Sequence, residues 1–309
     1  MPVLDLIGNT PLVELKKISS ELAGVSIWAK AEFRNLSGSV KDRAAKAMLL
    51  EGIESGRLRP GKTIIDASSG NTGIAYAVLG AVLGYPVKIY LPANASQERK
   101  TILACCGAEV VETNPLESSD GAFLAAKAEA EAKPEHYFWP NQYNNDANWR
   151  AHYNTTGPEI WEQTGGGVTH FITGMGTSGT FMGASRRLKE FNPDIRAIAV
   201  QPDSPFHGIE GTKHMASTIN PGFYDPAFPD GFIEANTEAA YAMTVRLARE
   251  EGLFVGISSG ANVQAALDLG RTLPPGSLIV TVLCDSGFRY LSDTFWSVAE
   301  QVEGEGSGI

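Results

Sequence analysis

Lys41 stands where a stretch containing glycine and serine, "NLSGSV" (residues 35–40), gives way to the alanine-rich pattern "KDRAAKAML" (residues 41–49). A lysine amine can attack a carbonyl group to form an imine, and it can act as a base once it is released. The alternative is a lysine at a helix start that pairs with Asp42 or Asp66, since surface lysines are common. The loops elsewhere in the sequence bear on which interpretation holds.

Four predicted strand-to-helix junctions are rich in glycine, serine and threonine. They are residues 67–73 ("ASSGNTG"), 174–180 ("GMGTSGT"), 256–262 ("GISSGAN") and 284–293 ("CDSGFRYLSD"). Ligands of parallel α/β sheets gather at the carboxyl ends of strands, where helix N-termini offer free N–H groups to anions. Each junction is therefore a candidate anion site, although the third is equally compatible with a helix cap.

The first junction offers more donors than a helix cap needs. Ser69, Asn71 and Thr72 add side-chain donors to a backbone that contains two glycines. This combination favours a site for a carboxylate or a phosphate over simple N-capping.

The second junction supplies hydroxyls from Thr177, Ser178 and Thr180, which suit the oxygens of a terminal phosphate. Residues 174–179 also match GxGxxG, and Asp203 lies beyond the next predicted strand, as in dinucleotide-binding folds. A pyrophosphate bridge prefers bare backbone, so we favour a monophosphate. A nicotinamide-dependent oxidoreductase stays open as the alternative.

A lysine near several anion sites, without a metal signature, predicts imine chemistry with pyridoxal phosphate (PLP). This cofactor needs a Schiff-base lysine, a phosphate site and a partner for its ring nitrogen. The five histidines show no metal-ligand spacing and the three cysteines form no CxxC pair, so no metal site is predicted. A catalytically silent binding protein is a further alternative.

The composition excludes other classes of function. The 309 residues are 43% hydrophobic and 19% charged, with a formal net charge of -10. This is typical of a globular protein and argues against nucleic acid or an anionic membrane as partner. No secretory signal is visible, and Pro86 and Lys88 divide the longest apolar stretch. We expect a cytoplasmic protein without a membrane span.

Short β-branched segments alternate with longer segments of helical periodicity. The predicted strands are residues 62–67, 87–92, 109–113, 169–174, 196–202 and 277–285. The predicted helices are residues 71–84, 96–107, 119–133, 179–191, 237–252 and 258–270. This alternation predicts an α/β fold, and the apolar strands predict parallel sheets covered on both faces. Residues 220–232 are expected to form a structured loop.

The segment "SGSVKDRAA" (residues 37–45) resembles the cofactor-lysine motif of fold-type II PLP enzymes, in particular the cysteine synthase and cystathionine β-synthase family. Further segments match this family in the same order along nearly the whole chain: "IGNTPLVEL", "SSGNTGIA", "NQYNNDANWRAHYNTTGPEIW", "GMGTSGT", "GISSGA" and "DSGFRYLSD". The resemblance implies a tryptophan synthase β-like fold of two domains, each with a mostly parallel twisted sheet. We expect residues 1–12 and 35–146 to form a smaller, mobile domain, and residues 13–34 and 147–309 the larger domain that holds the phosphate.

The resemblance also implies a role for each site residue. Lys41 carries the cofactor, Asn71 binds its ring hydroxyl and Ser286 faces its ring nitrogen. The phosphate is held by Gly176, Thr177, Ser178, Gly179 and Thr180. The substrate is bound by Ser68, Ser69, Gly70, Asn71, Thr72, Gln142, Gly211 and Lys213. The family usually has glycine where Ser178 stands. Asp146 and Asn148 are more consistent with turn formers than with catalysts.

A serine at the ring nitrogen, unlike a carboxylate, does not hold a proton there, which disfavours a long-lived carbanion. We therefore expect a β-replacement that passes through α-aminoacrylate, with Lys41 removing the Cα proton and a sulfur nucleophile adding to give L-cysteine. The stretch "GIEGTKHM" (residues 208–215) is closer to the cysteine synthase B-like branch. Lys213 and His214 are candidates to meet an anionic leaving group or donor, although a solvated basic loop fits the sequence equally well.

The substrates and partners stay open. The activated serine is O-acetylserine or O-phosphoserine, and the sulfur donor is sulfide, thiosulfate or a carrier-protein thiocarboxylate. Condensation of serine with homocysteine, as in cystathionine β-synthase, is the alternative. We expect a homodimer, with serine acetyltransferase or a sulfur-carrier protein as a further candidate partner.

Overall fold

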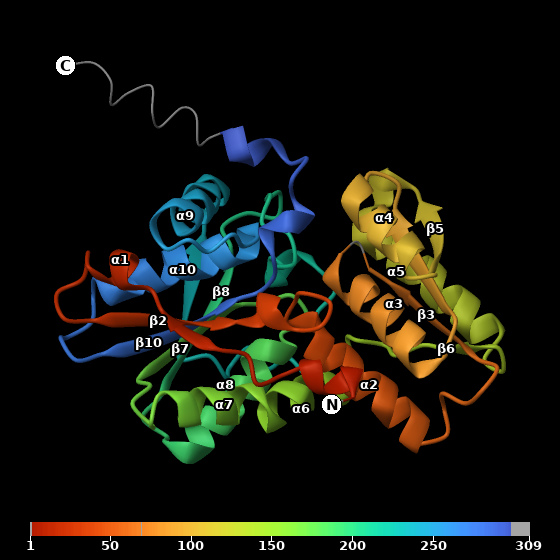
Figure 1. Cartoon of the computed structure of the whole chain (residues 1–309), viewed down its shortest axis with the longest axis horizontal. Helices are drawn as coiled ribbons and strands as arrows, with labels where there is room; N and C mark the ends of the chain where they lie inside the picture. The colour runs from red at the N-terminus through yellow and green to blue at the C-terminus, as the bar shows by residue number, and fades with distance from the viewer. Residues whose placement is uncertain (1, 69, 298–309) are drawn as a thin grey trace.

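The computed structural model describes residues 2–68 and 70–297, which form two twisted sheets flanked by helices (Figure 1). The larger sheet has six strands in the order β1-β2-β10-β7-β8-β9, and the smaller has four in the order β5-β4-β3-β6. Every strand pairing is parallel except that of β1 with β2. The predicted α/β class with mostly parallel sheets is confirmed.

The larger sheet consists of β1 (Leu12–Glu14), β2 (Ser26–Ala31), β7 (His170–Gly174), β8 (Arg196–Pro202), β9 (Gly231–Ala235) and β10 (Leu278–Leu283). The smaller sheet consists of β3 (Thr63–Ala67), β4 (Val87–Pro92), β5 (Glu109–Thr113) and β6 (Tyr137–Phe138). The α-helices are α1 (Lys16–Ser19), α2 (Lys41–Glu54), α3 (Asn71–Leu83), α4 (Gln97–Cys105), α5 (Ser118–Ala132), α6 (Ala147–Asn154), α7 (Thr156–Gln163), α8 (Gly179–Phe191), α9 (Thr237–Glu250) and α10 (Ile257–Gly270).

Each strand and helix predicted from periodicity is present, with ends that differ by at most two residues. The expected loop at residues 220–232 runs into an edge strand, β9, whose first four residues alternate between half-buried and exposed and whose last, Ala235, is buried. Asn148, which was expected in a turn, lies in the first turn of α6.

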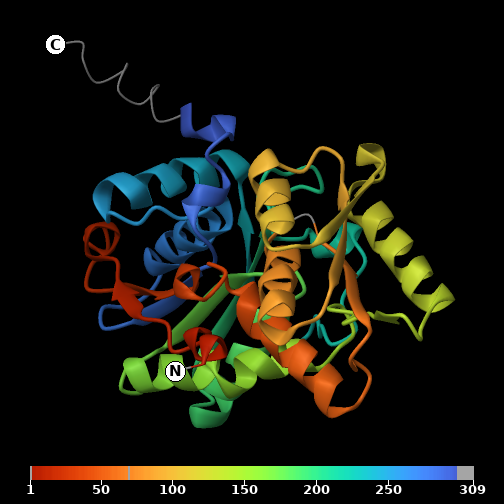
Figure 2. The ribbon, with the colours of Figure 1, turned by 45° about the vertical axis from the view of Figure 1, so that its right-hand side comes forward.

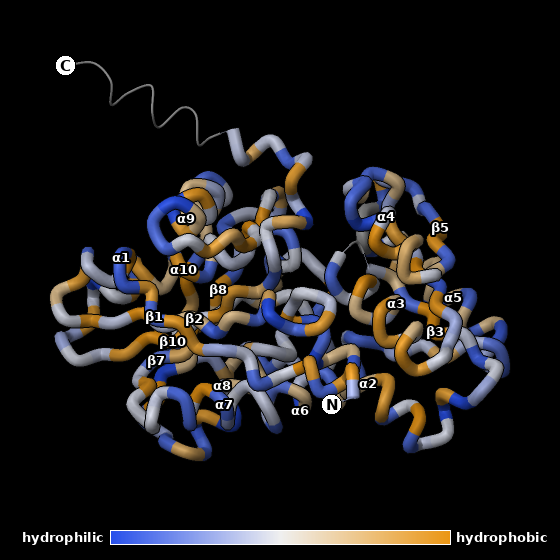
Figure 3. The backbone as a smooth tube through the Cα atoms, in the orientation of Figure 1, coloured by the Kyte–Doolittle hydropathy of each residue, from blue (hydrophilic) through white to orange (hydrophobic). Residues whose placement is uncertain are grey.

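The strands are apolar because helices cover both faces of each sheet. On β10, Ile279 belongs to the core beneath α9 and α10, whereas Val280 belongs to the core beneath α7 and α8. On β3, Ile64 packs with residues of α2 and α3, whereas Ile65 packs with residues of α5. Successive strand residues point to opposite faces, so each strand needs apolar residues at consecutive positions. Figure 3 shows this hydrophobic character along the inner strands.

Two separate segments of the chain form the larger sheet. Strands β1 and β2 come from its first 31 residues, the smaller sheet is made from residues 63–138, and the chain then returns to complete the larger sheet. In Figure 2 the orange to yellow-green segment forms one lobe, and the red segment lies with the green to blue ones in the other. The exact domain boundaries stay a prediction. No helix within the described residues is long and apolar enough to cross a bilayer.

Candidate active site

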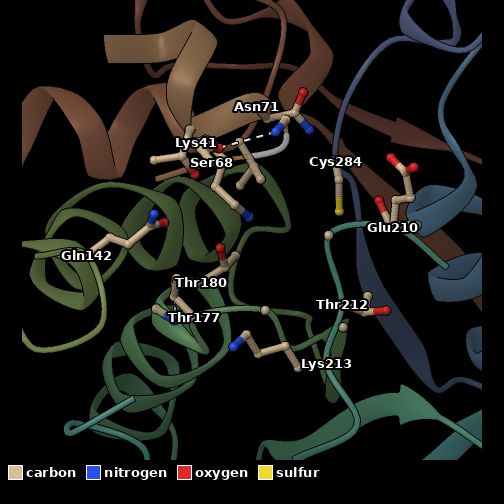
Figure 4. A pocket seen from close by; sticks show the side chains of 18 of the residues that line it. Lys41, Ser68, Asn71, Gln142, Thr177, Thr180, Glu210, Thr212, Lys213 and Cys284 are labelled. Carbon is tan, nitrogen blue, oxygen red and sulfur yellow. Dashed lines mark hydrogen bonds between the residues drawn. The ribbon is translucent and has the colours of Figure 1, made fainter. Parts of the chain in front are cut away.

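A cleft lies between the two sheets at the carboxyl ends of β3, β7 and β10 (Figure 4). Four helices start at it: α2 at Lys41, α3 at Asn71, α8 at Gly179 and α10 at Ile257. Helix N-termini carry unpaired N–H groups and the positive ends of the helix dipoles. The cleft therefore favours anionic ligands, although the whole chain is acidic.

The cleft brings together most of the residues predicted from the sequence. Its lining includes Lys41, Ser68, Gly70, Asn71, Thr72, Gln142, Gly176, Thr177, Ser178, Gly179, Thr180, Gly211 and Lys213. Figure 4 shows labelled members of this set around one space, with Lys41, Ser68 and Asn71 on one side and Lys213 on the other. Ser69 lies outside the described residues.

Ser286 does not line the cleft, so its predicted place there is wrong. The chain turns away after β10 into a 3-10 helix, where the Ser286 hydroxyl accepts a hydrogen bond from the Phe288 N–H at 3.3 Å. Its backbone also pairs with that of Val255. Ser258, in the first turn of α10, lines the cleft instead and is 6% exposed. The junction "GISSGAN", which looked equally like a simple cap, supplies this residue.

Lys41 is fixed by the packing of the helix that it starts. Two residues further on, both sides of the Arg43 guanidinium are paired: Nε and Nη2 donate to Glu32 at 2.8 Å, and Nη1 donates to Glu159 at 2.6 Å. The amide of Val40 also donates to the carbonyl of Cys284 at 2.8 Å. These contacts tie the start of α2 to β10, to α7 and to the segment after β2.

The Arg43 cluster is buried and its charges are balanced. Burial opposes ionisation of Glu159, but the charges of Arg43 and Lys30 outweigh it and lower the pKa to about 2. The same balance, dominated by Arg43, lowers the pKa of Glu32. Lys30, which is fully buried, lies 2.6 Å from Glu159. Removing one partner of a buried pair typically costs about 3–5 kcal/mol, so this cluster rigidly defines the position of α2.

The loop of residues 176–180, which is predicted to hold the phosphate and is called the phosphate loop below, is shaped by close contacts. A Cβ on Gly176 would lie 2.4 Å from the carbonyl oxygen of Gly211, and a Cβ on Gly179 would lie 2.1 Å from Asn148 Oδ1. Ser178 has a left-handed backbone (φ 61°), which explains why glycine is usual at this position in the family. Its hydroxyl is buried with no hydrogen-bond partner among the described residues. A donor of this kind at the start of α8 is available for a bound anion.

Two side chains of α6 support this loop from behind. Asn148 Nδ2 donates to Thr177 Oγ1 at 3.1 Å and to the Gln142 carbonyl at 2.7 Å. His152 lies between Thr156, at 2.9 Å, and Thr180, at 3.3 Å. Burial, together with the charge of Arg43, lowers the pKa of His152 to about 3, so the ring is neutral. Sequence reasoning missed both supports because neither has a recognisable spacing to the loop that it holds.

Gln142 lies above a buried carboxyl group. Its Nε2 is 3.3 Å from the Ala67 carbonyl and 3.4 Å from Asp66 Oδ2, while Trp139 Nε1 donates to Asp66 Oδ1 at 3.2 Å. Burial raises the pKa of Asp66 to about 7, although hydrogen bonds from the Ala67 N–H and from Trp139 oppose this rise. Through these contacts with Gln142 and Trp139, Asp66 supports the wall of the cleft.

Charged residues also line the mouth of the cleft. Arg99 of α4 pairs with Glu210 from the loop after β8, and its guanidinium lies 5.2 Å from the centre of the Tyr290 ring. Lys213 Nζ lies 4.4 Å from the centre of the Tyr143 ring, and burial lowers its pKa. The cleft thus holds two lysines and an arginine against one glutamate, which favours anionic substrates.

Cys284, on the cleft floor, is not suited to be a nucleophile. Burial raises its pKa to about 11, although the charge of Lys41 opposes this, so the thiol stays protonated near neutral pH. Within residues 2–68 and 70–297, no three His, Cys, Asp or Glu side chains gather in a way that would hold a metal ion.

The sequence pattern of the family described as "Pyridoxal-phosphate dependent enzyme" matches residues 3–285 of this chain. The chain belongs to this family. Cysteine synthase of Aquifex aeolicus is 50% identical over 300 residues, covering 96% of this chain and 92% of the relative. Cysteine synthase B of Pseudomonas aeruginosa is 42% identical over 291 residues, covering 94% and 95%. The resemblance seen in the sequence is confirmed.

Solved structures agree with this membership of the PLP-dependent enzyme family. Cysteine synthase of Entamoeba histolytica aligns with a TM-score of 0.90 at 36% identity, covering 96% of this chain and 90% of the other. The O-acetylserine dependent cystathionine β-synthase of Helicobacter pylori also aligns with a TM-score of 0.90, at 35% identity, covering 96% and 98%. The nicotinamide alternative raised by GxGxxG is therefore wrong.

The residues present fit PLP. The unpartnered Ser178 hydroxyl and the N–H groups at the start of α8 suit its phosphate, and Lys41 projects into the same cleft. Glycines at 176 and 179 allow a close approach of backbone that no other residue would permit.

Proposed function

We propose that this protein makes L-cysteine by β-replacement on an activated serine. The C–O bond of O-acetylserine breaks and acetate leaves; a C–S bond to sulfide forms. The observation that carries the proposal is the convergence of Lys41, residues 68 and 70–72, and residues 176–180 on one cleft. The two cysteine synthase relatives, at 50% and 42% identity, support it.

Bound PLP supplies an electron sink for the bonds of the substrate Cα. Lys41 would hold the cofactor, and its free amine would accept the Cα proton as a general base and return it as a general acid. Gln142, Thr72 and the backbone at the start of α3 orient the substrate carboxylate, which places the Cα–H bond toward the lysine amine. Ser258 takes the part first predicted for Ser286, because it is the serine at the cleft; its hydroxyl does not hold a proton on the ring nitrogen.

The proposal is tested with purified protein reconstituted with PLP. We expect visible absorbance that borohydride bleaches, a change in that absorbance on adding O-acetylserine, and cysteine formation when sulfide follows. Lys41→Ala should lower turnover by at least about 100-fold, since general acid–base catalysis typically contributes that much. Lys46→Ala is the matched control, because this lysine lies on the same helix with its amine on the Leu4 carbonyl. Near-normal turnover in Lys41→Ala would refute the mechanism.

Lys213 is proposed to bind an anionic leaving group or sulfur donor. Its lowered pKa and its place on the lining show that it is partly desolvated within the cleft, which strengthens attraction to an anion. We predict that Lys213→Ala lowers kcat/KM for O-phosphoserine about tenfold more than for O-acetylserine, a difference of about 1.4 kcal/mol. Lys127→Ala, on the exposed side of α5, is the control. Equal losses of kcat/KM for the two substrates would contradict this role of Lys213.

The homodimer, the cytoplasmic location and a complex with serine acetyltransferase or a sulfur-carrier protein stay predictions. The Helicobacter pylori structure named above uses the same fold, so the fold alone does not choose between sulfide and homocysteine as nucleophile. Comparing the two nucleophiles with O-acetylserine as the fixed first substrate decides this.

A further inference from the structure

Two charged residues from the segment after β10 hold the Asn71 side chain. Asn71 Nδ2 donates to Asp285 Oδ2 at 2.7 Å, and Asn71 Oδ1 accepts from Arg289 Nη1. Both partners are buried, with exposed fractions of 0% for Asp285 and 5% for Arg289. Asn71 starts a helix of the smaller lobe, so the larger lobe fixes an amide that belongs to the smaller one.

These contacts determine which way the amide faces. A guanidinium only donates hydrogen bonds and a carboxylate accepts them, so a flipped amide would lose both bonds. The amide nitrogen carries two N–H groups. Asp285 takes one of them, and the other has no partner among the described residues. Because Asn71 lines the cleft beside Lys41 and Ser68, this second N–H is available to a bound acceptor (Figure 4).

The two partners are themselves held in place. Asp285 Oδ2 also accepts from the Tyr290 hydroxyl at 2.6 Å, and a Cβ on Gly256 would lie 2.2 Å from Asp285 Oδ1. Arg289 Nη2 donates to the carbonyl of Ser37, in the loop that leads to Lys41. Arg289 thus links the approach to the catalytic lysine with the Asn71 amide.

The environment of the Asp285 carboxylate is energetically unfavourable at one of its oxygen atoms, and packing does not explain why. Its Oδ1 atom is buried without a hydrogen-bond partner among the described residues. A buried polar atom without a partner is unfavourable, and each such exception in a native protein calls for an explanation, such as a functional role.

We propose that Asp285 and Arg289 are positioning residues that set the Asn71 amide so that one N–H is presented to the cofactor. This rests on the proposed function and on the role that the family resemblance implies for Asn71, which is to meet the ring hydroxyl of PLP. Neither residue touches the reacting atoms; both act through Asn71.

A double-mutant cycle tests the proposal. The dissociation constant of PLP is measured by fluorescence on reconstituting the apoprotein of the wild type, Asn71→Ala, Asp285→Ala and the double variant. We expect each single change to weaken binding about tenfold, as for a lost hydrogen bond, and the double variant to bind about as weakly as either single one. Multiplied losses, about 100-fold in the double variant, would overturn the proposal, since Asp285 would then act independently of Asn71.

Further variants separate positioning from folding. Asp285→Asn keeps a carbonyl acceptor and should restore the affinity lost in Asp285→Ala; failure of this rescue contradicts the proposal. Asp203→Ala is the matched control, because Asp203 accepts from Asn236 Nδ2 at 2.9 Å at an exposed place outside the cleft lining. If Asp285→Ala does not fold, Asp285→Ser replaces it in the cycle.

The proposed function is judged separately in the same experiment. A wild type that binds no PLP, or whose visible absorbance borohydride does not bleach, refutes the proposed function. A wild type that binds PLP normally, with an additive cycle, refutes only the positioning role.

Discussion

The loop predicted to hold the phosphate (residues 176–180) and the loop predicted to hold the substrate carboxylate (residues 68 and 70–72) each follow a parallel strand and start a helix, yet different parts of the molecule hold them. Asn148 and His152 of α6, which packs on α8, support the phosphate loop from its own lobe. The Asn71 side chain of the carboxylate loop is held by Asp285 and Arg289 from the other lobe. The loop predicted to hold the phosphate is therefore supported from its own lobe, whereas the loop predicted to hold the substrate carboxylate is supported across the two lobes.

The largest expected effect comes from disrupting the phosphate loop, which is supported from its own lobe. Gly179→Ala places a Cβ 2.1 Å from Asn148 Oδ1, and Asn148 is also bonded to Thr177 and to the Gln142 carbonyl. Accommodating an added methyl group in a packed site typically costs about 1–3 kcal/mol. We therefore expect PLP affinity to fall about 10- to 100-fold. Fluorescence titration of the apoprotein measures this change.

The control for this prediction is Gly231→Ala on β9, where the new Cβ meets only the end of the Ile198 side chain at 3.3 Å. Its PLP affinity should match that of the wild type. Equal losses in both variants would mean that crowding at Asn148 does not shape the phosphate loop.

The next effect concerns the wall beneath the carboxylate loop. Burial raises the pKa of Asp66 to about 7 from an ordinary value of 3.8, so the folded state binds more protons than the unfolded state between these values. The free energy of unfolding should therefore fall as pH rises through this window, by at most about 1.4 kcal/mol per pH unit from this group. In Asp66→Asn this contribution should vanish, which urea unfolding between pH 4 and 8 would reveal.

Tyr76→Phe sharpens the test, because the Tyr76 hydroxyl, which donates to Met48 Sδ at 3.9 Å, also acts on Asp66 and lowers its pKa. Without this hydroxyl the pKa of Asp66 should be higher still, so the free energy of unfolding should continue to fall up to a higher pH. Parallel pH profiles for the wild type and Asp66→Asn would contradict the assignment.

The smallest effect isolates backbone strain in the phosphate loop. Ser178 has a left-handed backbone, which costs a residue with a Cβ about 1–2 kcal/mol. Ser178→Gly and Ser178→Ala both remove the hydroxyl, but only glycine relieves the strain. We expect the free energy of unfolding of the apoprotein to be about 1 kcal/mol higher for the glycine variant than for the alanine variant. Equal stabilities would show that the loop bears no such strain.

The sequence predicted the elements of both lobes well, because strands buried on both faces are apolar runs and helices have their own period. It also predicted Lys41 and the two loops, since glycine and hydroxyl residues at strand ends have a direct physical purpose. It did not distinguish Ser258 from Ser286, because both lie in short stretches rich in glycine and serine, and only the structure shows that the chain after β10 turns Ser286 away from the cleft. The Arg99–Glu210 pair joins residues 111 positions apart, a distance at which local patterns carry no information.

The place of β2 between β1 and β10 has a consequence for the newly made chain. All four strands of the smaller sheet come from residues 63–138, so this sheet can pair while later residues are still being synthesised. The parallel neighbour of β2 is β10 (Leu278–Leu283), which is synthesised near the end of the chain. One edge of β2 therefore stays unpaired until β10 leaves the ribosome. At typical rates of about 5–20 residues per second, that edge waits for more than about ten seconds. An unpaired, apolar strand edge is prone to aggregation, so this interval is where the chain most needs a chaperone.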